Sequence, residues 1–503
     1  MNEFYSEVQL KDLSSRDIKN LRYDIAGELV LLQSDSEIEQ QETCNLRKLT
    51  IDEKADFKAA IYWLKIYEPE PEATNLEQVR GYLEGFHHLC EISCWQEASQ
   101  LLFITPKLKV VDLASSNFSS EQELHKQLKT WAYYPQLIEL YSRLLGKLDL
   151  KLDGILLQGL GITNCYLGKF QNAINYHQQQ LELARKINDR KVEAQALKGL
   201  SFTYSRLGQF KTAFDYNQQY SQITYELKDP DDIALALDAT GGSYGNVGYF
   251  QKEIKYYHQA LKIAREIGNK QIETQVLGSL GATYCRRGKH RQGIVYIQQQ
   301  LEFSIQTSNR RETWRALYHL GIGYLMFKDY QKGNDYLNQA LVIVREIGDK
   351  YGEYMTLSGF GASYARTKKY QLAIEYLQQA LKINYEIGGK NSAIIILSNL
   401  AYCYSNLKQH TKGMRYIKKA MVLARKSDDR REKGIVLAIL ANAYWQQGRY
   451  ILGLLVITRS IFKLLSWWRW EAFQFILQKT VEEINQGILR GITHLLRFLP
   501  FLR

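Results

Sequence analysis

Tyrosine recurs every 40 residues along this sequence, with no insertion or deletion between repeats. One series comprises Tyr204, Tyr244, Tyr284, Tyr324, Tyr364, Tyr404 and Tyr444, and a second comprises Tyr176, Tyr216, Tyr256, Tyr296, Tyr336, Tyr376 and Tyr416. A fixed period of this length indicates an array in which each unit buries its apolar face against its neighbours. The sequence therefore predicts an extended repeat rather than one globular core.

Each repeat carries the pattern of two helices. In one unit Leu237, Thr240, Gly241 and Tyr244 fall at i, i+3, i+4 and i+7, which places them on one face of a first helix. A second helix is predicted from about Phe250. Glycine marks the turn between the two helices at Gly168, Gly208, Gly248, Gly288 and Gly448, and the sequences IGNK (267–270), IGDK (347–350) and IGGK (387–390) close the units.

A period near 40 also occurs in HEAT, armadillo and WD40 arrays, so the motif within the unit decides the family. The helical pattern excludes WD40, and the Leu-Gly-x-x-Tyr spacing disfavours HEAT. That spacing is followed by Gly-x-Phe/Tyr and then Ala, as in Leu207-Gly208-Gln209-Phe210 and Ala213, and it resembles the tetratricopeptide repeat (TPR) signature. Residues 264–284 more narrowly resemble the 40-residue repeats of the LGN/Pins group and of long cyanobacterial arrays.

The resemblance implies an all-α, right-handed superhelical solenoid of antiparallel helix pairs with helical N- and C-terminal extensions. We expect an acidic helical segment at 1–75, degenerate TPR-like helices at 76–152, eight tandem units at 153–466, and a capping or amphipathic basic helix at 467–503. Residues 1–75 hold 9 Lys/Arg and 16 Asp/Glu, a net charge of −7, so the remainder carries +19. The prolines of EPEPEA (68–73) predict a break before the next helix.

The six cysteines show no tight framework of pairs, so we expect reduced, mostly buried thiols and a cytoplasmic protein. The N-terminus lacks a secretory signal, and no stretch of about 18 apolar residues predicts a membrane-spanning helix. His87, Cys90 and Cys94 would share one helical face, but no second Cys/His cluster completes a metal site. A buried helical face is the preferred interpretation of these three residues.

No catalytic motif or cofactor site is predicted. GGSYGNVG (241–248) superficially resembles a phosphate-binding loop, but Gly241 and Gly248 occupy positions that other repeats share. The glutamines of HQQQLELAR (177–185) and IQQQLEF (297–303) are expected on the solvated surface of second helices. The chain is therefore expected to be a non-enzyme.

The face of each first helix opposite the packing stripe is the candidate binding surface. In TPR proteins this face resembles the wall of a concave groove that receives peptides, and arginine recurs there in alternate units. A ladder of guanidinium groups suits carboxylates or an extended peptide backbone, although ordinary exposed arginines remain the alternative. The candidate groove residues are Lys198, Phe202, Arg206, Asn246, Arg286, Arg366, Asn399 and Asn406.

One position departs from the LGN/Pins pattern. Repeats of that group carry an asparagine before the Leu-Gly pair, and only Asn399 retains it here, the other units having Gly159, Gly199, Ala239, Ser279, His319, Gly359 and Ile439. The partners of that group are therefore not transferred to this chain.

The C-terminal segment allows two interpretations. Residues 484–503 contain three arginines, no acid and a broad apolar stripe, so they form either a cap on the last repeat or a basic amphipathic anchor on a membrane surface. Membrane contact would involve Trp467, Trp468, Trp470, Arg490, Arg497, Phe498 and Phe501.

Taken together, these features predict a non-catalytic scaffold that binds other proteins or peptides, with an acidic or extended partner segment in its groove. The alternative is a peripheral membrane adaptor or assembly factor tethered by the C-terminal helix. Nucleic-acid binding is disfavoured because no aromatic and basic module demands it.

Overall fold

The computed structural model describes residues 50–70, 73–106, 122–246, 249–389, 393–426 and 430–465. The chain divides into two compact units, one comprising Met1–Val111 with Ser120–His125 and the other Asp112–Ser119 with Lys126–Arg503. The acidic residues 1–49 and the whole C-terminal segment 467–503 lie outside the described residues, and so does Gly248.

The first unit contains α2 (Ile51–Ile61), the π-helix η2 (Tyr62–Ile66), α3 (Asn75–Gln78), α4 (Arg80–Glu91) and α5 (Trp95–Phe103). A capping box starts α2, because the Thr50 hydroxyl accepts a bond from the Glu53 N–H and the Glu53 carboxylate accepts one from the Thr50 N–H. Helical structure stops at Ile66 and resumes at Asn75, and Pro69 lies in the interval, as the sequence predicts.

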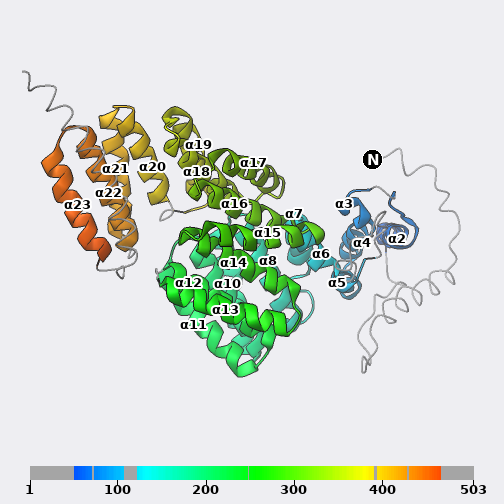
Figure 1. The fold of residues 1–503 in the computed structure, drawn as a ribbon. Helices are drawn as coiled ribbons and strands as arrows, with labels where there is room; N and C mark the ends of the chain where they lie inside the picture. The colour runs from blue at the N-terminus through cyan, green and yellow to red at the C-terminus, as the bar shows by residue number, and fades with distance from the viewer. Residues whose placement is uncertain are drawn as a thin grey trace, which may run out of the picture. The chain divides into compact units, whose positions relative to one another are not determined.

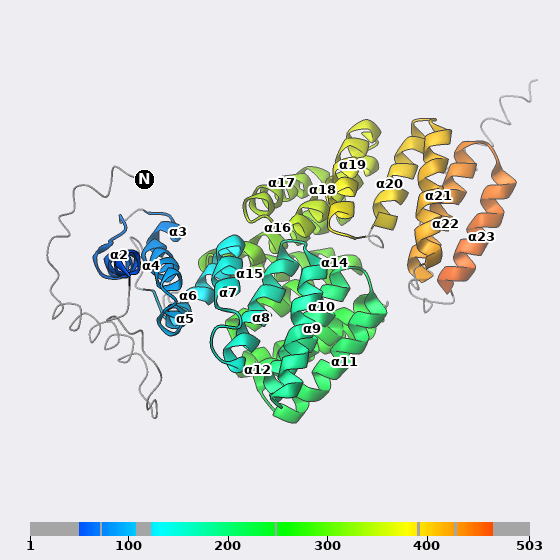
Figure 2. The ribbon, with the colours of Figure 1, turned by 180° about the vertical axis from the view of Figure 1, so that it is seen from behind.

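The second unit is built from antiparallel helix pairs that follow one another along the chain (Figures 1 and 2). Two helices, α6 (Leu124–Trp131) and α7 (Tyr134–Leu144), precede them. The pairs are α8 (Leu150–Tyr166) with α9 (Phe170–Lys186), α10 (Arg190–Arg206) with α11 (Phe210–Leu227), α12 (Pro230–Asn246) with α13 (Phe250–Glu266), α14 (Lys270–Arg286) with α15 (His290–Gln306), α16 (Arg310–Met326) with α17 (Tyr330–Glu346), α18 (Lys350–Arg366) with α19 (Tyr370–Glu386), α20 (Ala393–Asn406) with α21 (His410–Lys426), and α22 (Arg430–Gln446) with α23 (Tyr450–Leu465).

Short polar residues at 40-residue intervals set where the first helices begin. Asp149, Asp189, Asn269, Asn309 and Asp349 are N-caps whose side chains accept hydrogen bonds from backbone N–H groups of the first turn. Each cap satisfies donors that have no partner inside the helix. The second helices mostly lack such a cap and begin immediately after a tight turn.

The turns between the two helices of a unit pass through the left-handed backbone region in each repeat whose turn the structure describes. Gly168, Gly208, Gly288 and Gly448 have φ between 73° and 79°, as the sequence predicts for turn glycines. The equivalent residues of other repeats are lysines with the same backbone, Lys328, Lys368 and Lys408, with φ between 60° and 68°. The turn geometry therefore belongs to the repeat and is kept where glycine is absent.

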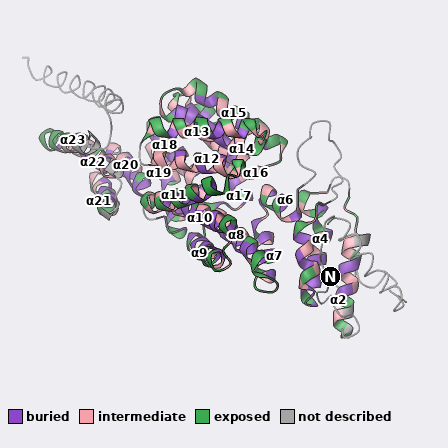
Figure 3. Cartoon of the chain, turned by 90° about the horizontal axis from the view of Figure 1, so that it is seen from below, coloured by how far each residue is buried: buried purple, intermediate pink, exposed green. Residues whose placement is uncertain are grey.

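The two tyrosine series pair with each other inside each unit. The rings of Tyr204 and Tyr216 stack with centroids 5.6 Å apart, and five further pairs, Tyr244–Tyr256, Tyr284–Tyr296, Tyr324–Tyr336, Tyr364–Tyr376 and Tyr404–Tyr416, have centroids 5.4–5.8 Å apart. Each pair joins the end of a first helix to its second helix. Buried residues, purple in Figure 3, accordingly form bands along the helices beside exposed green bands.

The prediction that the repeated glutamines are solvated is wrong for Gln180 and Gln300, which are completely buried. The Gln180 amide donates to the Gly154 carbonyl at 3.1 Å, and the Gln300 amide donates to the Glu312 carboxylate at 3.0 Å. Their neighbours at 178 and 179 are exposed. Successive side chains of a helix point in directions 100° apart, so a run of three glutamines begins on the surface and ends on the packing face.

The array also curves back on itself. Cys165, Phe170 and Ala173 from the first pair share one core cluster with Tyr354 and Ile387 from the sixth pair. The approach is close, since a Cβ added to Gly168 would lie 2.8 Å from Ile387 Cγ2. The first and sixth pairs thus contact each other although about 200 residues separate them. Leu207, which follows α10 of the second pair, packs against the same cluster. We call this contact of the sixth pair with the first two pairs the closure.

Candidate functional site

Lys198, Phe202 and Arg206 lie four residues apart along one face of α10, the face opposite the repeat core. Phe202 is 37% exposed, Lys198 is half-buried and Arg206 is 8% exposed. Side chains from the first two turns of α16 and α18 approach the same face, and we define the inner wall by Lys198, Phe202, Arg206, Arg311, Arg315 and Tyr351. Helices α10, α16 and α18 supply these side chains.

Arg206 is the central residue of the inner wall. Its guanidinium carbon lies 4.8 Å from the centre of the Phe202 ring and 4.2 Å from that of Tyr351, which is on α18 across the closure. Nη1 of this buried guanidinium has no hydrogen-bond partner among the described residues. Burial raises the pKa of the nearby Asp349 carboxyl, although the Arg206 charge opposes that rise.

The other predicted ladder arginines lie in different surroundings from Arg206. Arg286 donates to the buried Glu253 carboxylate at 2.5 Å and to the Thr283 hydroxyl at 2.9 Å. Arg366, at the end of α18, is exposed. The structure therefore gives the three arginines separate environments, and only Arg206 takes part in the closure.

The predicted asparagines are half-buried. Asn246 donates to the Ser205 hydroxyl of the preceding unit at 3.2 Å. Asn406 donates to the Tyr402 carbonyl within its own helix at 2.8 Å, and Asn399 lies one residue before the buried Leu400. Asn246 thus links neighbouring units, whereas Asn406 makes a local contact.

Sequence reasoning missed Arg311 and Tyr351, which occupy the repeat position of Lys191, two helical turns before Lys198. The Arg311 guanidinium carbon lies 4.0 Å from the Tyr166 ring centre and 5.9 Å from that of Phe202. Extending the candidate face two turns toward the N-terminus of each first helix would have included both residues. Their position in the 40-residue repeat was the sequence feature that could have identified them.

Ion pairs hold the cations of the inner wall on α16. The Glu312 carboxylate accepts from Arg311 at 3.0 Å and from Arg315 at 3.2 Å, and the same side chain accepts from Gln300. Burial raises the pKa of the Glu312 carboxyl, but the charges of Arg315 and Arg311 outweigh burial and hold that pKa below its usual value. Glu312 is therefore ionised at neutral pH.

Lys129 on α6 adds a further cation near the inner wall. Burial, together with the positive charges of Lys198, Lys126 and Arg311, lowers the pKa of its ammonium group to about 8. Burial also lowers the pKa of Lys198, which Asp232 and Asp238 partly offset. No repeat register could have found Lys129, because α6 precedes the array.

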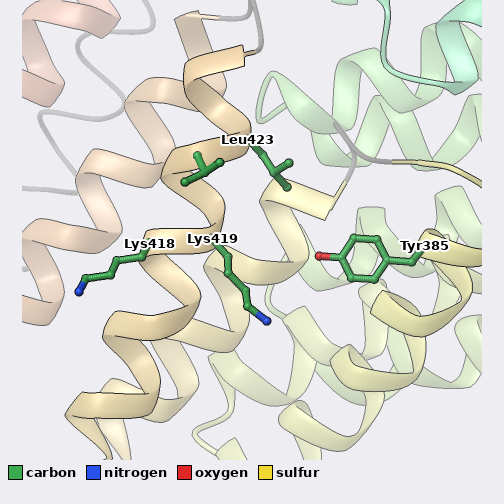
Figure 4. A pocket seen from close by; sticks show the side chains of 5 residues that line it. Tyr385, Lys418, Lys419 and Leu423 are labelled. Atoms are coloured by element: carbon green, nitrogen blue, oxygen red, sulfur yellow. The ribbon is translucent and has the colours of Figure 1, made fainter.

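A separate shallow pocket of about 370 Å³ lies between second helices α19 and α21, lined by Tyr385, Lys418, Lys419, Val422 and Leu423. Figure 4 shows the Tyr385 hydroxyl directed toward α21, from which Lys419 extends. The pocket is on second helices and is therefore distinct from the inner wall.

The structure separates the three residues weighed as metal ligands. His87 is exposed on α4 beside Glu91 and Cys90 is buried, whereas Cys94 lies beyond the end of α4 as the N-cap of α5. In the described ranges no group of three or more His, Cys, Asp or Glu side chains is placed to hold a metal ion. The expectation of a buried helical face is therefore wrong for His87, which is exposed, and for Cys94, which lies outside the helix.

The expectation of six reduced thiols is also wrong for Cys94, which is disulfide-bonded. Cys90, Cys165, Cys285 and Cys403 are free and buried. Burial raises the pKa of the Cys285 thiol to about 11 and that of Cys403 to about 12, which keeps both protonated at neutral pH.

Comparison with known families identifies the repeat. A tetratricopeptide repeat model matches residues 154–226 and 312–386, and a second tetratricopeptide repeat model matches residues 395–426. The chain is a tetratricopeptide repeat protein. The narrower resemblance of this TPR protein to the LGN/Pins group and to cyanobacterial arrays stays a prediction.

Solved structures share the TPR fold at low sequence identity. A Rap protein complexed with Competence and Sporulation Factor aligns with a TM-score of 0.54 at 14% identity, covering 68% of this chain and 96% of that one. The APC/C hetero-tetramer Cut9-Hcn1 aligns with a TM-score of 0.45 at 14% identity, covering 87% of this chain and 81% of that one. NprR in complex with its cognate peptide NprX aligns with a TM-score of 0.45 at 15% identity, covering 67% of this chain and 100% of that one. No curated protein matches the sequence.

Proposed function

We propose that this TPR protein is a non-catalytic scaffold that holds a segment of another protein along its inner wall. Arg206 is the observation that carries the proposal, because its buried guanidinium lies between two aromatic rings with Nη1 unpaired in the described structure. An unpaired buried donor costs free energy, which a carbonyl or carboxylate of a partner would recover.

The surroundings of Arg206 favour an extended or acidic segment. Phe202 and Tyr351 offer ring faces, and Lys198 and Arg311 offer charge-assisted donors on the same wall. A Rap protein with a similar fold was solved with Competence and Sporulation Factor bound, which accords with a ligand-holding role for such an array.

The test is charge reversal of the three arginines that the sequence predicts for the groove, of which Arg206 lies on the inner wall. We expect Arg206→Glu, Arg286→Glu and Arg366→Glu, combined in the full chain, to lose partners that the wild type captures from lysate. A matched control reverses three exposed lysines of second helices, Lys255, Lys262 and Lys382, with the same change in net charge. Unchanged capture by the arginine variant would remove the groove mechanism.

Because Arg206 and Arg286 make internal contacts, a second variant separates binding from folding. Arg366 is exposed, so Arg366→Glu alone should keep the helical circular dichroism and melting curve of the wild type while weakening capture several-fold. Capture that falls only when the melting curve also changes would indicate a structural role instead.

A second candidate function is tethering to a membrane surface through residues 467–503. The last described helix, α23, exposes Ile451 at 79% and Leu455 at 62%, so apolar surface reaches the end of the described array. Within the described part of the chain, no helix is both long and apolar enough to cross a bilayer. A tether would therefore use the interfacial contacts of Trp467, Trp468 and Trp470.

Liposome flotation distinguishes the tether from a cap. The full chain should float with anionic vesicles, whereas a chain truncated after residue 466 should stay in the dense fraction. If both chains stay in the dense fraction, the tether is wrong, and residues 467–503 are then best explained as the cover of the α23 apolar face.

A further inference from the structure

The second helices change character in the last two units of the array. Each second helix from α9 to α19 contains at least one acidic residue, whereas the sequences of α21 and α23 contain none. Basic residues take their place on α21, and those that the described structure exposes are Lys412, Arg415, Lys418, Lys419 and Arg425. This end of the array therefore presents a cationic surface with no carboxylate on the same helix.

Among the described residues, an ion pair that recurs in alternate units is not repeated at this end. Arg185, Arg265 and Arg345 each donate from Nε to a glutamate eight residues later, at 3.0, 2.8 and 2.9 Å. Arg425 is the next member of this series, and the position eight residues after it holds Lys433. The last two units thus add a positive charge where the earlier units neutralise one.

The apolar surface of α23 lies at positions that are polar in the other second helices. Ile451 is 79% exposed and Leu455 is 62% exposed. The position of Ile451 is polar in all seven earlier units, and that of Leu455 is polar in all but the unit that has Val295. Both positions are exposed in every earlier unit, namely at Gln171, Asn175, Lys211, Asp215, Gln251, Lys255, Arg291, Val295, Gln331, Asp335, Gln371, Glu375, Thr411 and Arg415. A further unit stacked on α23 would therefore leave Ile451 and Leu455 uncovered.

Leu454 differs from these two residues, because its position normally packs against the next unit. It is 56% exposed, whereas Ile174 and Ile294 at the same repeat position are buried in clusters shared with the following first helix. A terminal cap explains the exposure of Leu454, but the apolar side chains of Ile451 and Leu455 require another explanation.

Helices α21 and α23 belong to one packed block. Ile417 of α21 and Leu440 of α22 share a core cluster, against which Val456 of α23 packs. Equivalent positions of stacked units face the same side, since each unit is only slightly rotated from the one before. We call this surface the outer face and define it by Arg415, Lys418, Lys419, Ile451 and Leu455.

We propose that the outer face binds an anionic lipid bilayer. Its cations meet the headgroup phosphates, and the two aliphatic side chains of α23 enter the boundary of the acyl region. A bilayer suits this combination because it offers many negative charges above an apolar interior and needs no shaped groove. The inference rests on the proposed tether through residues 467–503 and deepens it, because one weak contact attaches a protein to a bilayer only marginally and a second makes attachment stable.

Flotation of the full chain with phosphatidylcholine vesicles, with and without about 30% phosphatidylglycerol, tests the cations of the outer face. The wild type should float with the anionic vesicles and much less with phosphatidylcholine alone. Lys418→Gln with Lys419→Gln should weaken binding about tenfold or more, since each cation at an anionic surface contributes about fivefold. The matched control, Lys255→Gln with Lys262→Gln on α13, removes the same charge from exposed positions and should bind as the wild type does. Equal flotation with the two kinds of vesicle would overturn the proposal.

Ile451→Gln with Leu455→Gln tests the apolar residues of the outer face. Binding to the anionic vesicles should weaken about tenfold or more, because burial of each aliphatic side chain contributes about that factor. The control is Val295→Gln with Val342→Gln, which changes side chains that are 51% and 57% exposed on α15 and α17 and should leave binding unchanged. All these positions are exposed, so every variant should keep the helical circular dichroism and melting curve of the wild type.

The outcomes separate the outer face from the tether. If both outer-face variants float like the wild type while truncation after residue 466 abolishes flotation, the outer face is wrong and the tether stands. If the truncated chain floats and the outer-face variants do not, the tether is wrong and the outer face stands. A full chain that stays in the dense fraction with anionic vesicles contradicts both.

Light scattering examines the other possible occupant, a second copy of this chain. The wild type and the Ile451→Gln, Leu455→Gln variant should have the same mass in solution. A wild-type dimer that this variant converts to a monomer would show that a second copy covers the outer face, and it would overturn the lipid proposal.

Discussion

At the scale of single residues, one repeat position can serve several purposes. In the first seven units the position of Gln180 is alanine four times, glutamine twice and tyrosine once. It is buried in all seven, namely Gln180, Tyr220, Ala260, Gln300, Ala340, Ala380 and Ala420. A glutamine fits where the neighbouring first helix has glycine, since a Cβ on Gly278 would lie 2.2 Å from Gln300 Oε1. Packing against the neighbour therefore decides which side chain the position holds.

Tyr324→Ala tests the stacked tyrosine pairs. Tyr324 is 9% exposed, stacks on Tyr336 and has the Lys332 ammonium 4.9 Å from its ring centre. We expect the substitution to reduce the free energy of unfolding by about 3–5 kcal/mol, as large-to-small aromatic changes in cores do. Tyr324→Phe, which keeps the ring, should cost much less.

Hydrogen exchange locates the damage in Tyr324→Ala. Because units contact mainly their neighbours, amides of α16, α17 and the adjoining pairs should exchange faster while α22 and α23 keep their rates. A mild and uniform acceleration would contradict the burial of Tyr324.

Lys129 predicts a pH dependence of stability. The pKa of its ammonium is about 8 in the folded chain and near 10.5 when unfolded, so between these values the unfolded chain binds more protons. The contribution of Lys129 to stability is therefore unfavourable below pH 8 and improves as the pH rises toward 10.5. Lys129→Gln should raise the urea midpoint at pH 7 and reduce its increase between pH 7 and 9, whereas Lys262→Gln should leave that increase unchanged.

At the scale of the helix pair, the turn conformation is shared by glycine and non-glycine residues. Lys368 has φ of 63° and Gly288 has φ of 79° at equivalent positions. A left-handed conformation costs a residue with a Cβ about 1–2 kcal/mol, against which glycine loses about 0.5–1 kcal/mol of backbone entropy on folding. The repeat tolerates this cost because packing of the two helices fixes the turn.

Reciprocal substitutions measure that cost. Lys368→Gly should stabilise the chain by up to about 1 kcal/mol, and Gly288→Lys should destabilise it by a similar amount. Nothing lies within 4 Å of a Cβ added to Gly288, so the change tests the backbone alone. Thermal melting of the two variants should therefore shift in opposite directions, and equal or parallel shifts would rule out backbone strain as the cause.

At the scale of the whole array, the closure couples units that are remote in sequence. Tyr351 contacts the Arg206 guanidinium on α10 and lies 6.1 Å from the Phe170 ring centre on α9. In an open solenoid a change at Tyr351 would disturb only α17 to α20. Because of the closure, a change at Tyr351 should also disturb the first two helix pairs.

Tyr351→Ala tests this coupling. Amides in α8 to α10 should exchange several-fold faster than in the wild type, while those of α13 and α14, which lie between in sequence, should not change. Tyr249→Ala removes an exposed tyrosine of another unit and is the control. Faster exchange confined to α17 to α20 would show that the closure does not couple these pairs.

The sequence by itself determined the all-α repeat, the pairing of helices and the positions of the turns, because those contacts join residues at fixed offsets within one unit or the next. Tertiary structure decided the burial of Arg206, its separation from Arg286 and Arg366, and the contact of Arg311 with the Tyr166 ring. These features depend on the small rotation between successive helix pairs, which accumulates over several units until remote pairs come into contact. The accumulated rotation cannot be predicted from the residue pattern of a single unit.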